Sequence, residues 1–145
     1  MKRREFLNRI AFGTLITGGA VVTSAVLQIP VPQTGAGSRR HGIGNINQYP
    51  LNHFTFLPEK NIYLYRDRKG IKAVSAICTH LGCILQRSDA GFRCPCHGSK
   101  FNNRGEAVSG PAIRDLDWHS VIREPDGRIM IIEDISVSPE TLLEI

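Results

Sequence analysis

Most of this chain has no net charge. Residues 41–145 carry twelve Lys and Arg side chains and twelve Asp and Glu side chains, so the whole net charge of +5 lies in the first 40 residues. Nucleic-acid binding needs a basic face on the folded domain. The balanced charge therefore argues against nucleic acid as a partner.

Charged residues are also absent between Ile10 and Ser38. Residues 10–29 are mostly apolar, and as a helix they would span roughly 30 Å, about the thickness of a hydrocarbon core. The basic residues ahead of this run predict an N-terminus in the cytoplasm and a C-terminal part outside it. We expect residues 1–29 to be an uncleaved, single-pass membrane anchor.

The start of this segment, Arg3-Arg4-Glu5-Phe6-Leu7, resembles the twin-arginine export signal. That route moves folded proteins, which suits a cofactor inserted in the cytoplasm. The alternative is an ordinary positive-inside anchor in which the two arginines are coincidental. A cleavage site at Thr23-Ser24-Ala25 is disfavoured because it falls inside the apolar run.

Residues 30–40, PVPQTGAGSRR, are predicted to be a flexible linker. Pro30 and Pro32 end the preceding helix. Arg39 and Arg40 are expected at the outer headgroup surface. The linker is interpreted as a tether that lets the domain swing, with a plain spacer as the alternative.

Sustained helical periodicity is missing after residue 40, except for a possible helix after Ser138. Strand-like runs are separated by turn signals such as Arg66–Gly70 and Glu124–Gly127. The pattern predicts an all-β fold, a small antiparallel domain over residues 41–145, with Trp118 in its core. The expected strands are residues 53–57, 61–65, 71–77, 91–93, 118–123 and 128–132.

Cysteine is absent outside the window from Cys78 to Cys96, which holds all four. Two disulfides are one interpretation for an exported domain. Two histidines interleave with the cysteines, however, and this spacing favours a metal site. Structural zinc sites usually take two cysteines from one half of the motif and two histidines from the other. Each half here instead combines one cysteine with one histidine, as Cys-x-His and Cys-x-x-His. Mixed halves suit a two-iron cluster in which one iron takes thiolates and the other takes imidazoles.

The two halves, CTHLGC and CPCHGS, resemble the cluster-binding loops of Rieske proteins, specifically those of cytochrome bc complexes. The resemblance implies a Rieske-type domain with a cluster-binding subdomain and one [2Fe–2S] cluster. It assigns Cys78 and Cys94 to one iron and His80 and His97 to the other. It also implies a disulfide that joins Cys83 and Cys96, for which two free thiols are the alternative.

Further residues match the same family. Gly110-Pro111-Ala112 resembles the proline loop that covers the cluster. In relatives a serine and a tyrosine tune the potential by donating hydrogen bonds to cluster and ligand sulfurs; Ser99 keeps the first, and Phe101 replaces the second. Loss of a donor disfavours reduction. We therefore expect a low potential, which favours menaquinol over ubiquinol as the reductant.

The resemblance implies the iron–sulfur subunit of a quinol:cytochrome c oxidoreductase in the bacterial cytoplasmic membrane, with the Rieske domain outside. His97 would take a proton from quinol bound on a cytochrome b subunit, with Leu81 as the apolar docking tip. The electron would then pass to a c-type cytochrome or a similar acceptor. The subunit would be an electron carrier without turnover of its own.

The alternative is the small Rieske subunit of an arsenite-oxidase-type molybdenum enzyme. A cleaved or loosely anchored N-terminus would favour that class. Three histidines outside the two loops, His41, His53 and His119, are expected to be ordinary surface or partly buried residues.

Overall fold

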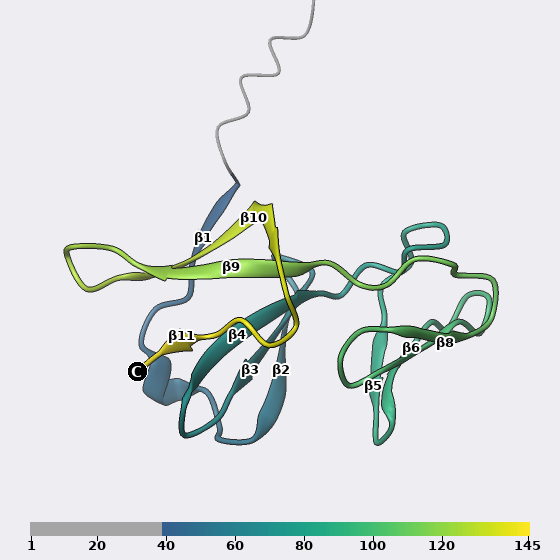
Figure 1. Cartoon of the computed structure of the whole chain (residues 1–145), viewed down its shortest axis with the longest axis horizontal. Helices are drawn as coiled ribbons and strands as arrows, with labels where there is room; N and C mark the ends of the chain where they lie inside the picture. Colours follow the sequence, from purple (N-terminus) through teal and green to yellow (C-terminus); the bar gives the residue numbers. More distant parts are fainter. Residues whose placement is uncertain (1–38) are drawn as a thin grey trace, which may run out of the picture. The chain divides into compact units, whose positions relative to one another are not determined.

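Two antiparallel sheets make up the part of the chain that a computed structural model describes, residues 39–145 (Figure 1). The larger sheet has the order β1-β10-β9-β4-β3-β2, with β11 paired to β4. Its central strands are rich in Ile, Val and Tyr, residues that suit a pleated and half-buried surface. Its strands are β1 (Arg40–Gly42), β2 (His53–Leu57), β3 (Ile62–Arg66), β4 (Gly70–Ser75), β9 (Trp118–Arg123), β10 (Ile129–Val137) and β11 (Leu143–Glu144).

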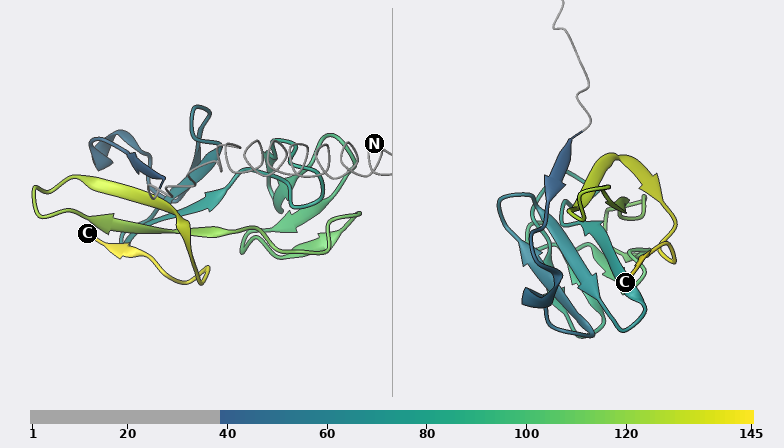
Figure 2. Two further views of the ribbon diagram at one scale, coloured as in Figure 1. Left: turned by 90° about the horizontal axis from the view of Figure 1, so that it is seen from above. Right: turned by 90° about the vertical axis from the view of Figure 1, so that its left-hand side faces the viewer.

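The smaller sheet is inserted between β4 and β9 and has the order β5-β6-β7-β8. Its strands are β5 (Gln86–Ser88), β6 (Gly91–Arg93), β7 (Lys100–Asn102) and β8 (Ala107–Ser109). Figures 1 and 2 show it beside the larger sheet rather than stacked on it. One 3₁₀ turn, η1 (Ile46–Gln48), is the only helical element in the described range. The predicted all-β antiparallel fold is confirmed.

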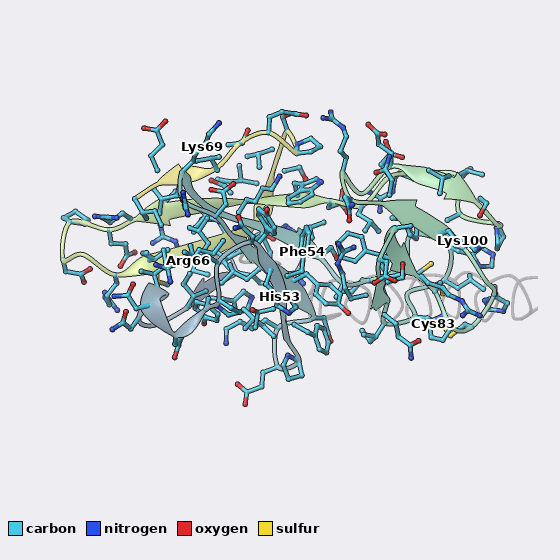
Figure 3. All side chains as sticks on the ribbon, turned by 90° about the horizontal axis from the view of Figure 1, so that it is seen from below. His53, Phe54, Arg66, Lys69, Cys83 and Lys100 are labelled. Atoms are coloured by element: carbon cyan, nitrogen blue, oxygen red, sulfur yellow. A yellow bond between two sulfur atoms is a disulfide. The ribbon has the colours of Figure 1, made fainter. Side chains whose placement is uncertain are left out.

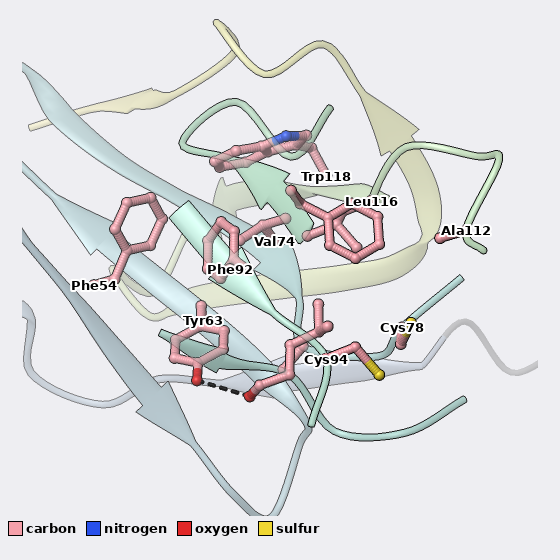
Figure 4. Packing of buried hydrophobic residues seen from close by; sticks show 12 residues of the cluster. Phe54, Tyr63, Val74, Cys78, Phe92, Cys94, Ala112, Leu116 and Trp118 are labelled. Atoms are coloured by element: carbon pink, nitrogen blue, oxygen red, sulfur yellow. Dashed lines mark hydrogen bonds between the residues drawn. The ribbon is translucent and has the colours of Figure 1, made fainter. Parts of the chain in front are cut away.

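One apolar core spans both sheets (Figure 4). Phe54 and Tyr63 of the larger sheet pack against Phe92 of the smaller one, with ring centroids 5.2 Å apart in both pairs. The Tyr63 hydroxyl donates a hydrogen bond of 2.9 Å to the Leu85 carbonyl. Trp118 is 3% exposed in the same core, as predicted. The larger sheet therefore supports the segment that carries the cysteines.

Most predicted strands are present, with shifted ends. Residues 53–57, 91–93 and 118–123 form strands with the predicted bounds. β4 ends at Ser75 rather than residue 77, and Ile77 instead forms an isolated bridge with Ile84. β10 continues to Val137 through a register shift between Ile132 and Ser136.

The possible helix after Ser138 was a wrong prediction. The tail forms β11, in which Leu143 pairs with Ile71 and Glu144 with Gly70. A Cβ at Gly70 would lie only 2.2 Å from the Leu143 carbonyl oxygen, so a glycine in β4 lets the tail approach. β11 has only two residues and is a strand because it pairs with β4, which is distant in sequence. Its own residues therefore show no strand pattern.

The two arginines at the end of the predicted linker are held by the folded domain. Arg40 is the first residue of β1 and pairs with Glu124 at 3.3 Å. Arg39 pairs with Glu133 at 3.2 Å. Both side chains therefore contact acidic groups of the domain, and they remain 71% and 48% exposed. No helix within residues 39–145 is long and apolar enough to cross a membrane, and the predicted span at 10–29 lies outside the described residues.

Candidate metal centre

The first cysteine–histidine loop connects β4 to β5 and is closed by its own backbone. The Cys78 N–H donates to the Cys83 carbonyl at 2.8 Å, and the Gly82 N–H donates to the Cys78 carbonyl at 2.9 Å. Gly82 has φ +79°, a conformation that L side chains rarely adopt. The Ile77–Ile84 bridge closes the base of the loop. This short, tightly bonded turn fixes the direction of each side chain on it.

The second loop connects β6 to β7 and repeats this geometry. The Cys94 N–H donates to the Ser99 carbonyl at 2.8 Å, and the Gly98 N–H donates to the Cys94 carbonyl at 3.1 Å. Gly98 has φ +74°. In both loops the glycine stands four residues after the first cysteine. That shared spacing was a visible sequence signal of loop geometry that the prediction did not use.

A disulfide between Cys83 and Cys96 ties the two loops together (Figure 3), with a Cα–Cα distance of 6.6 Å. Cys78 and Cys94 remain free thiols, 2% and 1% exposed. The Cys94 sulfur lies within 4.8 Å of both disulfide sulfurs. Because those two are bonded to each other, the trio offers a single thiolate to a metal.

Backbone donors surround the Cys94 sulfur. Burial raises the pKa of this thiol, but hydrogen bonds from the backbone N–H groups of His97 and Cys96 and from the Cys78 side chain bring its pKa below the usual value. Such donors stabilise the thiolate, which is the form that binds metals. Figure 4 shows the sulfurs of Cys78 and Cys94 at the edge of the apolar core.

The two histidines of the loops lie against each other. The ring centroids of His80 and His97 are 5.0 Å apart, and the ring planes make an angle of 87°. The His80 Nδ1 atom is buried and has no hydrogen-bond partner. A buried, unpartnered imidazole nitrogen is rare in a folded protein and fits a metal ligand. His97 is exposed, and Leu81, which follows His80 in the chain, is 70% exposed.

The predicted proline loop packs directly on the second loop. Gly110 has φ +91°, and a Cβ there would lie 2.5 Å from the Ser99 Cα, so only glycine fits this approach. The Ala112 N–H donates to the Ser99 Oγ at 3.1 Å. Pro111 is exposed, whereas Ala112 is buried. The loop that contains Gly110 and Ala112 therefore packs against Ser99 of the second cysteine–histidine loop.

Residues 99 and 101 have distinct surroundings. Ser99 is fully buried, and among residues 39–145 its Oγ has no hydrogen-bond acceptor. Its O–H proton is therefore available for a sulfur. Phe101 is 2% exposed and lies opposite Phe92 in the smaller sheet, so it is also a core aromatic.

Thr79 is a site residue that the sequence did not single out. Its Oγ1 donates to the Arg114 carbonyl and so ties the first loop to the segment after the proline loop. Threonine between a cysteine and a histidine carries no signal of this distant contact.

Of the remaining histidines, His53 is exposed, while His41 and His119 both contact Glu133, at 2.6 Å and 3.1 Å.

These features define a class: a small antiparallel β domain whose two tied loops present buried thiols and paired imidazoles, the donor set of an iron–sulfur centre. Residues 45–123 match the Rieske [2Fe–2S] domain family. The chain belongs to that family, and its domain binds a [2Fe–2S] cluster.

Known relatives agree with this assignment. The chain is 33% identical to the cytochrome b6-f complex iron-sulfur subunit of Synechococcus sp. (strain CC9605), over 87% of this chain and 82% of the relative. It is 33% identical to the subunit of the same name from Chlorobaculum tepidum, over 90% and 75%. A solved structure, the plasma membrane Rieske protein PetC3 from Synechocystis PCC 6803, is 31% identical over 54% of this chain and 82% of that chain, with a TM-score of 0.40.

Proposed function

We propose that this chain is the iron–sulfur subunit of a membrane quinol:cytochrome c oxidoreductase, or of a complex with a similar acceptor. The observation that carries the proposal is the contact between the imidazoles of His80 and His97 on the two loops that also carry two buried, free thiols. The names of the relatives, subunits of cytochrome b6-f complexes, support the same reading.

The proposed ligands are Cys78 and Cys94 for one iron and His80 and His97 for the other. The donor set fits because both thiols are free, the other two cysteines are bonded to each other, and the His80 Nδ1 lacks a partner. When bound, the cluster supplies a one-electron carrier whose potential is raised by its neutral imidazole ligands.

His97 is the proposed contact for quinol. Its ring is exposed, so a quinol hydroxyl can reach the outer ring nitrogen and donate a hydrogen bond and then a proton to it. Imidazole suits this task because small changes of environment move its pKa across the physiological range. Leu81 would supply apolar contact with the cytochrome b subunit, since this residue follows His80 in the chain and is 70% exposed.

The proposed topology is a single-pass anchor over residues 1–29 and a tether over residues 30–40, ahead of the Rieske domain on the outer side of the cytoplasmic membrane. The basic N-terminus and the uncharged stretch from Ile10 to Ser38 support this arrangement. The tether would let the domain move between the cytochrome b subunit and a c-type cytochrome. The buried Phe101, which lacks a hydroxyl, supports menaquinol as the reductant.

The test is purification of the full chain from its native membranes through a tag at Ile145. We expect stoichiometric b-type haem in the preparation and menaquinol-dependent reduction of a c-type cytochrome. In a His97→Leu variant this reduction should fall at least a hundredfold, whereas His53→Leu, which changes an exposed histidine outside the loops, should leave it intact. Molybdenum in place of haem, or full activity in His97→Leu, would contradict the proposal.

A further inference from the structure

Two like charges face each other beside the second loop. Arg93 of β6 and Lys100 of β7 are direct cross-strand partners, and both are exposed. Direct partners share a face of the sheet, and like charges in such positions destabilise it. The neighbouring pair, Phe92 and Phe101, lies on the opposite, buried face. The strand register therefore holds two positive charges together, which lowers the stability of the sheet.

Nothing in residues 39–145 neutralises this pair. Neither side chain has an acidic group within 4.0 Å, whereas Arg104 pairs with Glu106 and Arg114 with Asp117. Arg104 and Arg114 are thus paired with acidic groups within the domain. The Arg93–Lys100 pair remains as a free positive charge.

The pair borders a groove that runs along the second loop. The groove has a volume of about 550 Å³ and is lined by Arg93, Gly98, Lys100 and Val108, among others. Val108, on the neighbouring strand β8, is 60% exposed, so the groove offers apolar surface next to the two charges. Arg93 immediately precedes Cys94, and Lys100 follows Ser99, which places the pair at the base of the loop that carries the proposed iron ligands.

We propose that Arg93, Lys100 and the groove beside them form a docking surface for the acidic face of the protein that exchanges an electron with this chain. The inference rests on the proposed electron-transfer function. Unpaired charges at the edge of a redox site steer an oppositely charged partner and fix its orientation. An anionic membrane surface is the less favoured occupant, because lipid-binding patches gather four to eight basic residues and this one has two.

Two small oxidants of opposite charge test the local field. Ferricyanide is an anion and tris(phenanthroline)cobalt(III) is a cation, and each takes one electron from the reduced protein, becoming ferrocyanide or the cobalt(II) complex. The full chain with its cluster, in non-ionic detergent, is compared with an Arg93→Gln/Lys100→Gln variant by stopped-flow. A change of cluster potential alters both rates in the same direction, so the ratio of the two rates reports charge alone.

The matched control is Arg68→Gln/Lys69→Gln, which removes two exposed charges from the turn between β3 and β4. Figure 3 shows Lys69 in the left part of the view and Lys100 towards its right end. At low salt the ferricyanide-to-cobalt rate ratio should fall roughly tenfold in the Arg93/Lys100 variant and less than twofold in the control. The difference should vanish at about 1 M salt, where screening acts within about 3 Å. Equal ratios in the two variants, or an effect that survives high salt, would overturn the proposal.

Amine acetylation read by mass spectrometry tests the kind of partner. Poly-L-glutamate, a stand-in for an acidic protein face, should protect Lys100 at least threefold more than Lys69, and phosphatidylglycerol vesicles should not. Preferential protection by these vesicles, or none by polyglutamate, would overturn the proposal. If cluster-dependent oxidation itself is absent, the proposed function fails; if oxidation occurs without charge selectivity, only this inference fails.

Discussion

The Ser99 Oγ accepts a hydrogen bond from the Ala112 N–H at 3.1 Å, and both residues are buried. A Ser99→Ala variant would leave this N–H unpaired and would also remove the O–H proposed to donate to a cluster sulfur. We expect the free energy of unfolding to fall by about 1–3 kcal/mol. We also expect a lower reduction potential, because fewer donors stabilise the reduced centre less.

Equilibrium denaturation and redox titration of the loaded protein measure the two effects of Ser99→Ala. Ser109→Ala serves as the control, because Ser109 is exposed in β8. Equal potentials in Ser99→Ala and the control would show that the Ser99 hydroxyl does not act on the cluster.

A Phe101→Tyr variant tests whether the missing hydroxyl keeps the potential low. The added O–H should raise the reduction potential, because a hydrogen bond to a ligand thiolate stabilises the electron-rich reduced form. Redox titration monitored by the EPR signal of the reduced cluster gives the shift. Phe92→Tyr is the control, since Phe92 is the cross-strand partner of Phe101 and equally buried. An unchanged or lower potential in Phe101→Tyr would contradict the tuning role.

The Cys83–Cys96 disulfide should govern how firmly the two loops hold the cluster. It closes a loop with a sequence separation of 13 residues, for which chain-entropy arguments give about 3 kcal/mol of stabilisation. A Cys83→Ala/Cys96→Ala variant should therefore lose its visible absorbance at a lower temperature. Treatment of the wild type with dithiothreitol should have the same effect and should leave the variant unchanged. If all samples lose their visible absorbance at the same temperature, the disulfide does not help the two loops hold the cluster.

Sequence predicted those strands whose patterns are local. Residues 53–57 and 118–123 alternate apolar and polar side chains or are rich in β-branched and aromatic residues, and strong turns flank the hairpins. β5, β7 and β8 were missed because each has three residues and only a sparse apolar pattern. Their pairing with β6 and with each other, not their own propensity, makes them strands.

The proposed ligand set follows from the sequence, whereas the contacts that support the two loops do not. The spacing of Cys78, His80, Cys94 and His97 reflects chemistry that a ligand set needs, so it is visible in the sequence. The contact of Gly110 with Ser99, in contrast, depends on two loops that meet only in the fold. The same holds for Thr79 and Arg114, which are 35 residues apart.

His119 should make the stability of the domain depend on pH. Its Nδ1 lies 3.1 Å from the Glu133 carbonyl, which only accepts, so the neutral ring carries its proton on Nδ1. Burial lowers the pKa of His119, and this outweighs the opposing influence of Glu133. Below about pH 6.5 the unfolded chain therefore binds a proton that the folded chain does not. Stability should fall as the pH drops from about 6.5 towards the lowered pKa of the folded state, by at most about 1.4 kcal/mol per pH unit.

A His119→Asn variant keeps a side-chain N–H donor but does not titrate. Denaturant unfolding at pH 7.5, 6.5 and 5.5 should show a smaller loss of stability on acidification in this variant than in the wild type. His53→Asn, which removes an exposed histidine, should follow the wild type. Parallel pH profiles for His119→Asn and the wild type would mean that burial of this imidazole does not set the acid limit of the fold.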